Sequence, residues 1–272
     1  MRSIEFNGIR FTSGDDTPYI YNKFDPNAGD TSRQSENPLN YDGEMISNIT
    51  YNPRVVNIQG HIWGNTVEEL FKYKRELFNK CNGKTKAKLL YFDGKKQYQA
   101  AAIAEIPSCG DVEGLCISFN VNFTLYRFFW EDFYETQLLF DRKNEVTDKF
   151  TLPCVFTSRK LETTFQNKTD FAVYPVLTIQ ALSAAENKTV KIKNLTTGEE
   201  ISIDGYTFVS GEMITIDCEN YSAQSDINGN ILNQMNDFES WCLKAGANSV
   251  QCLNGGASVA IAIKFFVKYV GV

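Results

Sequence analysis

Few residues in this sequence have the chemistry of a catalytic or metal-binding site. His61 is the only histidine, which excludes metal sites built from several histidines and leaves one candidate base for a Cys–His or Ser–His arrangement. It lies in a run of alternating polar and apolar residues, and no local signature of a nucleophile accompanies it. We therefore interpret His61 as a partly exposed strand residue and not as a catalytic base.

The segment Asn82-Gly83-Lys84-Thr85 contains the Gly-Lys-Thr sequence of a phosphate-binding loop. Such a loop requires an earlier glycine at position 78, where this chain has Phe78. A phosphate-binding loop also precedes a helix, whereas this segment follows one that we expect. The sequence therefore does not predict a nucleotide site here.

An Asp-x-Asn-x-Asn motif over residues 226–230 has the first three ligand positions of a calcium-binding loop. The sixth position is Ile231 in place of glycine, and the twelfth is Asp237 in place of glutamate. The dipeptide Asn228-Gly229 instead favours a hairpin turn, because both residues tolerate positive φ angles. We expect no metal ion at this position.

Adjacent acidic residues such as Glu131-Asp132 and Glu199-Glu200 are poor acid–base pairs, because neighbours on a strand point to opposite faces of the sheet. The motifs GxSxG, HExxH and GxGxxG are absent from the chain. These observations predict that the protein is not an enzyme and has no cofactor. A glycosidase that uses scattered carboxylates is the remaining enzymatic alternative.

The composition excludes further classes of protein. The 272 residues include 27 basic and 33 acidic ones, for a net charge of −6, whereas a nucleic-acid-binding protein needs a basic surface. No apolar run approaches the roughly 20 residues that span a bilayer, and we expect no signal peptide at the N-terminus. An odd number of cysteines without a CxxC motif predicts reduced, mostly buried thiols: Cys81, Cys109, Cys116, Cys154, Cys218, Cys242 and Cys252.

Hydrophobic periodicity predicts the elements that position these residues. Residues 55–63 alternate as a strand that ends at Trp63. Thr66 and Glu69 form a capping box, in which each side chain satisfies a backbone N–H, and this predicts a helix over residues 66–81. The apolar face expected for this helix comprises Val67, Leu70, Phe71, Leu77, Phe78 and Cys81.

A hairpin and a long strand follow the helix. Asp93-Gly94 predicts a type I′ turn between strands at 89–92 and 97–103. Residues 117–125 then alternate without interruption, which is a strong strand pattern.

Residues 12–43 are polar, with glycine and proline scattered through them. Loops longer than about 12–15 residues are uncommon and are usually functional or disordered. Two interpretations are open: a flexible surface loop, or an arm that becomes ordered against a neighbouring subunit.

Beyond residue 131 short strands recur between glycine-containing turns: around Cys154 and over 175–179, 190–192, 201–203, 214–218 and 259–269. Many short strands at regular spacing predict a sandwich or jelly roll. We therefore predict a mainly β protein of two domains. Residues 1–130 form an α+β domain in which a β-sheet packs with one helix and a hairpin, and residues 131–272 form the sandwich.

The order of these elements resembles that of the distal tail (Dit) family of phage tail proteins. In the first half the resemblance rests on the strand before Trp63, the helix, the hairpin, the strand of 117–125 and the segment Phe128-Phe129-Trp130-Glu131-Asp132. In the second half it rests on the segments 174–179 (YPVLTI), 211–218 (GEMITIDC), 226–230 (DINGN) and 243–248 (LKAGAN).

The resemblance implies a structural component of the virion, at the tail tip or baseplate. Members of the family form hexameric rings in which the N-terminal domains surround a channel and galectin-like C-terminal domains project outward. The implied partners are further copies of the chain, the tail tube protein, the tail hub or tail-associated protein, and receptor-binding or baseplate proteins. Assembly would take place in the cytoplasm of the bacterial host, without binding of nucleic acid and without membrane insertion.

A closed ring requires head-to-tail contacts, which edge strands and a long arm can supply by strand addition. We expect the following aromatic and polar residues to form assembly contacts: Tyr19, Tyr21, Phe24, Arg54, His61, Trp63, Phe128, Phe129 and Trp130. Two alternatives remain open: a carbohydrate-binding module that uses the second domain, and another tail-tube or adaptor protein of similar architecture.

Overall fold

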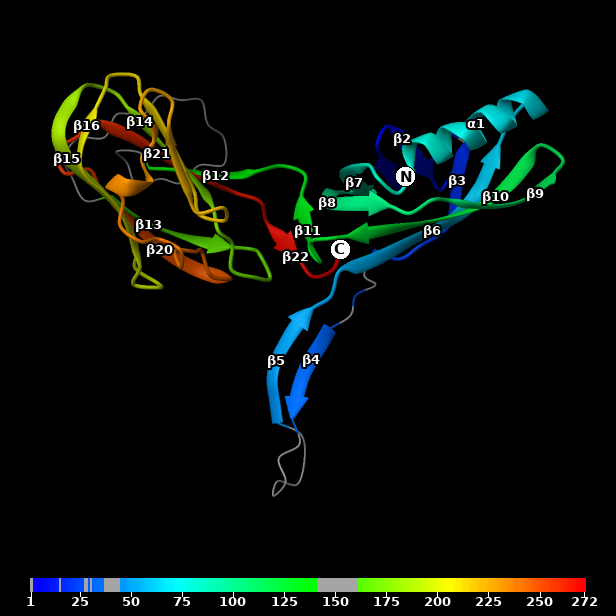
Figure 1. Ribbon diagram of the computed structural model, residues 1–272, viewed down its shortest axis with the longest axis horizontal. Coiled ribbons are helices and arrows are strands. Elements are labelled where there is room, and N and C mark those ends of the chain that lie inside the picture. The colour runs from blue at the N-terminus through cyan, green and yellow to red at the C-terminus, as the bar shows by residue number, and fades with distance from the viewer. Residues whose placement is uncertain (1, 15, 27–28, 30, 37–44, 141–160) are drawn as a thin grey trace. The chain divides into compact units, whose positions relative to one another are not determined.

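The computed structural model describes residues 2–14, 16–26, 29, 31–36, 45–140 and 161–272. The chain folds as two compact units, one formed by residues 1–133 with 269–272 and the other by residues 134–268. Strands predominate in both, and α1 (Val67–Lys80) is the single α-helix of the described residues (Figure 1). The prediction of a mainly β protein is confirmed.

The first unit is built on a closed barrel of seven strands. Its order is β8-β7-β1-β2-β3-β6-β10, and the pairing of β10 with β8 closes it. On either side of the closing pair the sheet continues, with β9 beyond β10 and with β11 and β22 beyond β8. The bounds are β1 Ser3–Phe6, β2 Ile9–Thr12, β3 Tyr19–Phe24, β6 Arg54–Trp63, β7 Lys86–Phe92, β8 Gln97–Ala104, β9 Ser108–Glu113, β10 Cys116–Leu125, β11 Trp130–Asp132 and β22 Lys268–Tyr269.

The alternation predicted for residues 55–63 and 117–125 is confirmed in the barrel core. The inward side chains of β10 are all buried, from Ile117 to Leu125 at every second position. Phe123 lies at the centre, with the ring of Phe6 at 4.9 Å and that of Phe11 at 6.4 Å. Each fully buried side chain of this size stabilises the fold by about 1.5–3 kcal/mol.

Helix α1 begins at a side-chain cap, as predicted. Thr66 Oγ1 accepts the backbone N–H of Glu69 at 3.2 Å. The reciprocal bond differs from the prediction, because Glu69 Oε2 accepts the N–H of Asn65 (3.0 Å) and not that of Thr66. The cap therefore holds the chain that enters the helix one residue earlier than a standard capping box does.

The buried face of α1 is narrower than predicted. Leu70 and Leu77 are buried with Cys81 against the barrel core, whereas Val67 and Phe71 expose 51% and 40% of their surface. At 3.6 residues per turn, these two lie about 60° and 100° around the helix from Leu70. The prediction that they belong to the buried face was wrong.

The hairpin of β7 and β8 forms where it was predicted, but its connection has four residues, 93–96, in place of a two-residue type I′ turn. Asp93 Oδ1 accepts the N–H groups of Lys95 and Lys96, each at 2.7 Å. These N–H donors, that of Lys96 foremost, hold the pKa of Asp93 below its ordinary value. The aspartate side chain thus organises a turn that the dipeptide alone does not specify.

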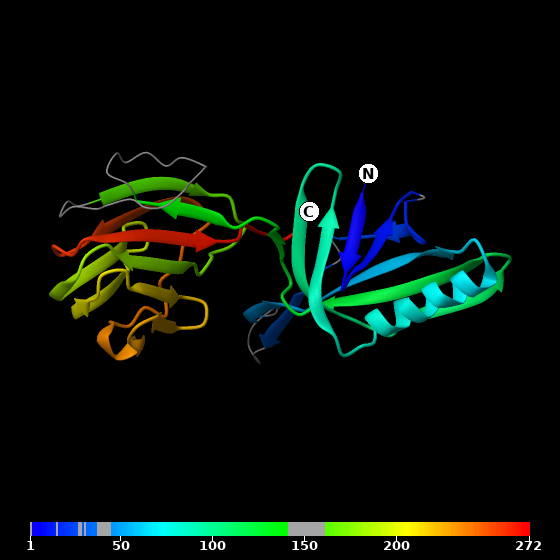
Figure 2. The ribbon, with the colours of Figure 1, turned by 90° about the horizontal axis from the view of Figure 1, so that it is seen from above.

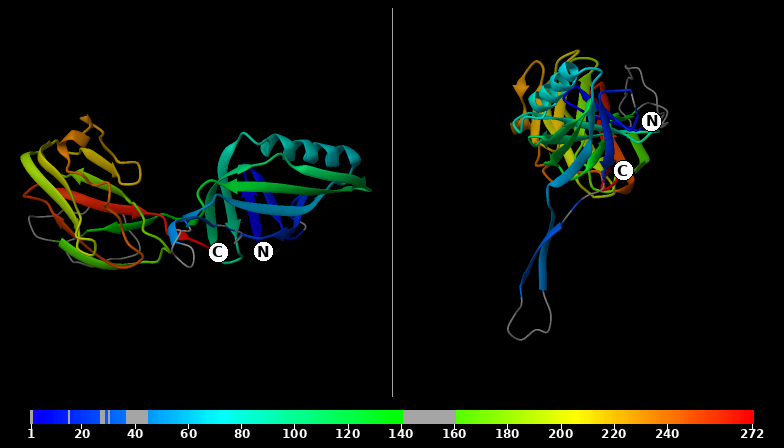
Figure 3. Two further views of the ribbon diagram at one scale, coloured as in Figure 1. Left: turned by 60° about the horizontal axis from the view of Figure 1, so that its bottom comes forward. Right: turned by 90° about the vertical axis from the view of Figure 1, so that its right-hand side faces the viewer.

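The described part of residues 12–43 is largely strand and not loop. β3 joins the barrel between β2 and β6, while β4 (Thr31–Glu36) pairs with β5 (Met45–Tyr51) in a separate two-stranded sheet. Every side chain described in β4 and over 46–51 is exposed. Figure 3 shows this hairpin, which we call the β4–β5 arm, extending from the body of the first unit. Exposure on both faces removes the apolar alternation by which strands are predicted.

The second unit is a β-sandwich, as predicted. One sheet has the order β12-β21-β14-β17-β18-β19 and the other β13-β20-β15-β16. The two layers are visible in Figure 2, and the rings of Phe165 and Phe265 meet between them at 6.3 Å. The bounds are β12 Thr136–Leu139, β13 Leu161–Asn167, β14 Val176–Ala181, β15 Ala185–Asn194, β16 Glu200–Phe208, β17 Met213–Asp217, β18 Ser222–Ser225, β19 Gly229–Asn230, the 3-10 helix η1 Leu232–Gln234, β20 Gly246–Leu253 and β21 Val259–Phe265.

The strand predicted over 259–269 divides into β21, which lies in the second unit, and β22, which spans the junction between residues 268 and 269. β21 ends at Phe265 within the sandwich, and β22 pairs with β11 of the first unit. The units are therefore joined at two points, between residues 133 and 134 and between 268 and 269. The predicted boundary near 131 lies close to the first junction, and the second was not predicted. The strand expected around Cys154 lies outside the described residues.

Candidate assembly surface

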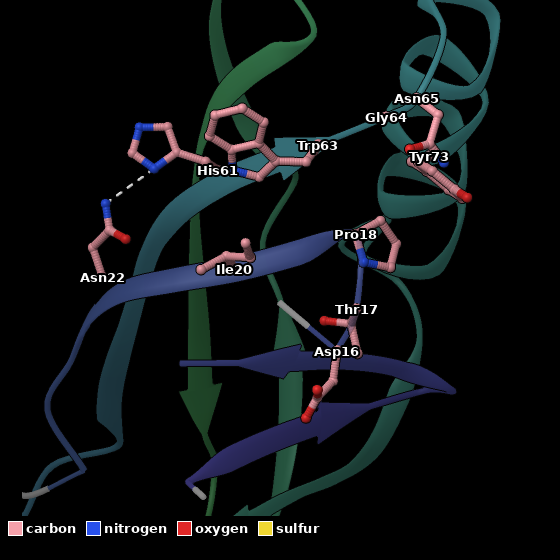
Figure 4. A pocket seen from close by; sticks show the side chains of 10 residues that line it. All are labelled: Asp16, Thr17, Pro18, Ile20, Asn22, His61, Trp63, Gly64, Asn65 and Tyr73. Carbon is pink, nitrogen blue, oxygen red and sulfur yellow. Dashed lines mark hydrogen bonds between the residues drawn. The ribbon is translucent and has the colours of Figure 1, made fainter. Parts of the chain in front are cut away.

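An open pocket of about 750 Å³ lies on the first unit over β3, the end of β6 and the first half of α1 (Figure 4). Hydrogen-bonding side chains line it together with the indole of Trp63, which is half exposed (50%). The lining residues are Asp16, Thr17, Pro18, Ile20, Asn22, His61, Trp63, Gly64, Asn65 and Tyr73. The part of the chain that the structure describes holds no cluster of His, Cys, Asp or Glu that could bind a metal ion. The pocket therefore offers a partner both hydrogen-bonding groups and an exposed aromatic ring.

A bulge in β3 shapes this pocket. The register between β3 and β6 shifts at Asn22, and the Asn22 side-chain amide donates to Nδ1 of His61 at 3.0 Å (Figure 4). Gly60 permits the two strands to approach, since a Cβ there would lie 2.1 Å from the carbonyl oxygen of Ile20. His61 is therefore a half-buried strand residue held by an asparagine, in agreement with the sequence interpretation.

Exposed apolar side chains also lie at the end of β6, in the first turns of α1 and just before β10. Trp63, Val67 and Phe71 are each at least 40% exposed, and Leu115 is 39% exposed. Leu115 lies beside the end of β6, because its carbonyl oxygen accepts the N–H of Gly64 at 3.2 Å. We call Trp63, Val67, Phe71 and Leu115 the apolar patch. Exposed apolar side chains that form a contiguous surface mark contacts with other proteins.

The candidate contacts predicted from the sequence differ in how much of their surface a partner could reach. The buried members are Tyr19, Arg54 and Trp130, the half-buried members are Tyr21, Phe24, His61, Phe128 and Phe129, and the exposed member is Trp63. Their role in assembly stays a prediction. The pocket brings His61 and Trp63 together, whereas the buried members hold the first unit's interior.

Tyr19 illustrates the buried group. Its hydroxyl lies 3.1 Å from the carbonyl oxygen of Tyr73 and 3.3 Å from Oε2 of Glu76, both on α1. Burial first, and then the Glu76 carboxylate, raise the pKa of this phenol. Tyr19 therefore fastens the helix to β3 and remains uncharged.

Arg54 and Trp130 meet at the base of the β4–β5 arm. Arg54 is 3% exposed, and its guanidinium donates to the carbonyl oxygens of Pro26 (3.1 Å) and Val270 (2.5 Å). The indole N–H of Trp130 donates to the same Pro26 oxygen at 2.9 Å. Burial lowers the pKa of Arg54, and the Asp25 carboxylate opposes this shift.

Sequence reasoning missed a buried polar cluster in the second unit. Glu212 is fully buried and accepts hydrogen bonds from the hydroxyls of Tyr206 and Ser225, each at 2.5 Å, from the N–H of Val209 at 2.9 Å and from the amide of Asn228 at 3.0 Å. Burial alone would raise the pKa of Glu212, but these donors, Ser225 and Tyr206 foremost, hold it below its ordinary value. The Gly-Glu step before an alternating strand was its only sequence signal.

The Glu212 cluster also explains the calcium-like motif over 226–230. Asn228 uses its side chain inside the cluster, and the backbone turns back at 226–228 so that Ser225 pairs with Gly229. The predicted hairpin is therefore present, but its turn lies at 226–228 and Gly229 already belongs to β19. The side chain of Asn228 is engaged with a carboxylate of the protein. The loop is a structural element of the sandwich.

The cysteines in the described part of the chain are free thiols. Burial raises the pKa of Cys81 to about 12 and also raises that of Cys218 and Cys252. Because the thiolate is the reactive form, these residues are small apolar core residues. Cys154 lies outside the described residues.

Comparison with known families identifies the class of protein. Residues 13–155 match the family described as phage tail protein, RIFT-related domain, and residues 168–269 match the siphovirus-type tail component, C-terminal domain. Among curated protein sequences, none matches the chain. None of the described helices has both the length and the apolar character needed to cross a bilayer.

Solved structures give the same fold. The crystal structure of SPP1 Dit (gp 19.1), described as a paradigm of the hub adsorption apparatus of phages that infect Gram-positive bacteria, is 12% identical, with a TM-score of 0.71 over 98% of this chain and 99% of that one. A chain of the phage P2 baseplate in its activated conformation with calcium is also 12% identical, with a TM-score of 0.54 and complete coverage of both chains. The present chain belongs to the siphophage distal tail protein family. It is a structural component of the phage tail and baseplate hub.

Proposed function

We propose that this chain forms a closed ring of six copies at the tip of the tail, which joins the tail tube to the host-recognition apparatus. The partners would be the tail tube protein on one side and the tail-associated, receptor-binding or baseplate proteins on the other. Ring assembly would take place in the cytoplasm of the bacterial host.

The β4–β5 arm carries the proposal. A two-stranded hairpin has little stability by itself in water, and this one exposes every described side chain, Ile46, Ile49 and Tyr51 among them at 49%, 60% and 50%. Exposure of three large apolar residues on a thin hairpin favours burial against another molecule. A second copy of the chain supplies such a partner in a ring.

The apolar patch supports the same proposal from a different place in the first unit. A ring needs two different surfaces on each copy, because head-to-tail contacts are heterologous. The arm, formed by β4 and β5, and the apolar patch, at the junction of β6 and α1, are separate in the fold. A protein that presents both can contact one neighbour with each of them.

The test removes the arm and keeps its base. A variant with residues 32–50 replaced by Asn-Gly retains the pair of Thr31 and Tyr51 at the base of the arm. We expect the intact protein to form rings in native mass spectrometry and cryo-electron microscopy. The variant should be monomeric, and its far-ultraviolet circular dichroism spectrum should still be that of a folded β protein. The matched control is Ile227→Asn, which removes an apolar side chain of similar exposure (52%) from the second unit and should leave the rings intact.

Two results would contradict the proposal. One is a chain that stays monomeric both alone and when produced together with the tail tube protein. The other is a variant without the arm that forms rings as completely as the intact chain.

A further inference from the structure

We infer that Tyr269–Val272, which we call the C-terminal segment, form together with Arg54 the socket that positions the β4–β5 arm for its contact with a neighbouring copy. The inference rests on the proposed function, because it assigns a positioning role within the proposed ring. It concerns residues that follow the second unit in the sequence but fold into the first.

The first observation is a polar anchor at Tyr269. The Lys96 ammonium lies 2.5 Å from Oδ1 of Asp132 and donates to the Tyr269 hydroxyl at 2.6 Å. The Tyr269 hydroxyl in turn lies 3.3 Å from Oδ2 of Asp132. The Tyr269 ring meets that of Tyr98 edge to face at 5.7 Å, with the ammonium 4.6 Å from its centre. These contacts hold the C-terminal segment against β8 and β11 through an ion pair, hydrogen bonds and a cation–π contact.

The second observation is the position of Arg54 between the C-terminal segment and the β4–β5 arm. Arg54 is the first residue of β6, and β5 ends at Tyr51 just before it. One NH2 group of its guanidinium donates to the carbonyl oxygen of Val270 in the C-terminal segment. The other donates to the carbonyl oxygen of Pro26, which precedes β4. A buried cation costs free energy unless it is hydrogen-bonded, so Arg54 holds both carbonyl groups in place.

The third observation is the packing around this bridge. The ring of Tyr51 stacks on that of Phe128 at 4.1 Å and an interplanar angle of 6°. A cavity of about 280 Å³ at the same place is lined by Gly29, Thr31, Tyr51, Asn52, Arg54, Phe128 and Val270. The walls of this cavity thus come from both strands of the β4–β5 arm and from the C-terminal segment.

The physical consequence is that the C-terminal segment and the orientation of the β4–β5 arm are coupled. The arm pairs with no other strand of the described residues, so its orientation depends on its base. Without the Val270 carbonyl, one branch of a buried guanidinium has lost its acceptor, and the chain on either side of the arm is free to shift. An arm whose base moves would meet a neighbouring copy in the right orientation less often.

The test removes the contact between Arg54 and the C-terminal segment. A chain ending at Tyr269 lacks the Val270 carbonyl and also Val272, which packs against the core of the first unit. Val270→Ala keeps both and controls for the Val270 side chain. Arg54→Lys keeps the positive charge but cannot bridge two carbonyl groups as a guanidinium does. Lys96→Gln weakens the Tyr269 anchor without changing Arg54, and it gives a second route if the shortened chain does not fold.

Two readouts separate the inference from the proposed function. Hydrogen exchange of the monomer measures the base of the arm, and native mass spectrometry measures the fraction of rings. We expect amides near Thr31 and Tyr51 to exchange at least about tenfold faster in the shortened chain and in Arg54→Lys. Exchange in β6 and β10 should not change, and Val270→Ala should match the intact chain. The ring fraction should fall in the same variants.

Unchanged exchange at the base of the arm in folded variants would overturn the inference, whatever the rings do. Faster exchange with an undiminished ring fraction would overturn its assembly part, because the socket would then not affect ring formation. If the intact chain itself forms no rings, the proposed function fails. The exchange measurement still decides whether the C-terminal segment positions the β4–β5 arm.

Discussion

Replacing Glu212 by glutamine preserves the shape of the side chain and changes one carboxylate oxygen into an NH2 group. The wild-type carboxylate accepts hydrogen bonds from four donors: Tyr206, Val209, Ser225 and Asn228. Three of them meet Oε1, and the Val209 N–H alone meets Oε2 at 2.9 Å. The least costly orientation of a glutamine therefore places its NH2 group against the N–H of Val209.

The expected loss follows from these contacts. An unsatisfied buried donor costs ~1–3 kcal/mol, and the three remaining bonds become neutral and weaker. Recovery of the desolvation cost of the carboxylate offsets part of this loss. We expect Glu212→Gln to lower the free energy of unfolding of the second unit by about 2–4 kcal/mol, which corresponds to a fall in Tm of about 10 °C for a domain of this size.

The effect of pH has a defined sign. The pKa of Glu212 in the folded protein lies below its ordinary value, so the carboxylate stabilises the fold fully above the unfolded pKa of about 4.3. This contribution is lost as the pH falls through the folded pKa. The difference in free energy of unfolding between the intact chain and Glu212→Gln should therefore be constant from roughly pH 6 to 8, well above the unfolded pKa. This difference should shrink as the pH falls below about 4.3.

The assay is urea unfolding of the full chain, followed by hydrogen exchange of peptides from β16 to β18 so that the second unit is read by itself. Glu186→Gln, on an exposed position of the same unit, controls for the loss of one negative charge and should change stability by less than about 0.5 kcal/mol. A Glu212→Gln variant as stable as this control at pH 7 would refute the reasoning.

Two further predictions concern the first unit and the thiols. Gly60→Ala should destabilise the first unit by about 3 kcal/mol, measured by thermal unfolding, because its Cβ would lie 2.1 Å from the Ile20 carbonyl oxygen; an unchanged Tm would show that β3 and β6 can separate without cost. Alkylation followed by mass spectrometry at pH 8 should label the half-buried cysteines first and the three buried ones only on unfolding, since burial raises the pKa of these three thiols: Cys81, Cys218 and Cys252. Labelling of the buried thiols at the rate of the others in the folded protein would contradict their assignment to the core.

The parts of the fold that the sequence predicts are those that bury one face of a regular element. The run of 117–125 alternates because β10 packs one side against the core, and Thr66 is recognisable because a helix start needs an acceptor for its N–H groups. The family resemblance depends on the order of such elements. These features are local, so they are visible without knowledge of the tertiary contacts.

The parts that the sequence did not predict depend on contacts between distant residues. The arm has no buried face, so β4 and β5 lack the alternation that marks a strand. The bulge at Asn22 is set by the approach of Gly60, some forty residues later in the chain. Arg54 and Trp130 were expected to form assembly contacts, yet both are buried and each hydrogen-bonds the Pro26 carbonyl.

The two junctions between the units lie on neighbouring strands. β11 leads into the second unit and β22 leads out of it, and these strands pair with each other. The sandwich is thus an insertion into a loop of the first unit, with its entry and exit at adjacent positions. A host fold tolerates an inserted domain when the two ends of that domain lie close together. The pairing of β11 with β22 supplies this closeness, so the first unit can complete its own sheet across the point at which the sandwich is inserted.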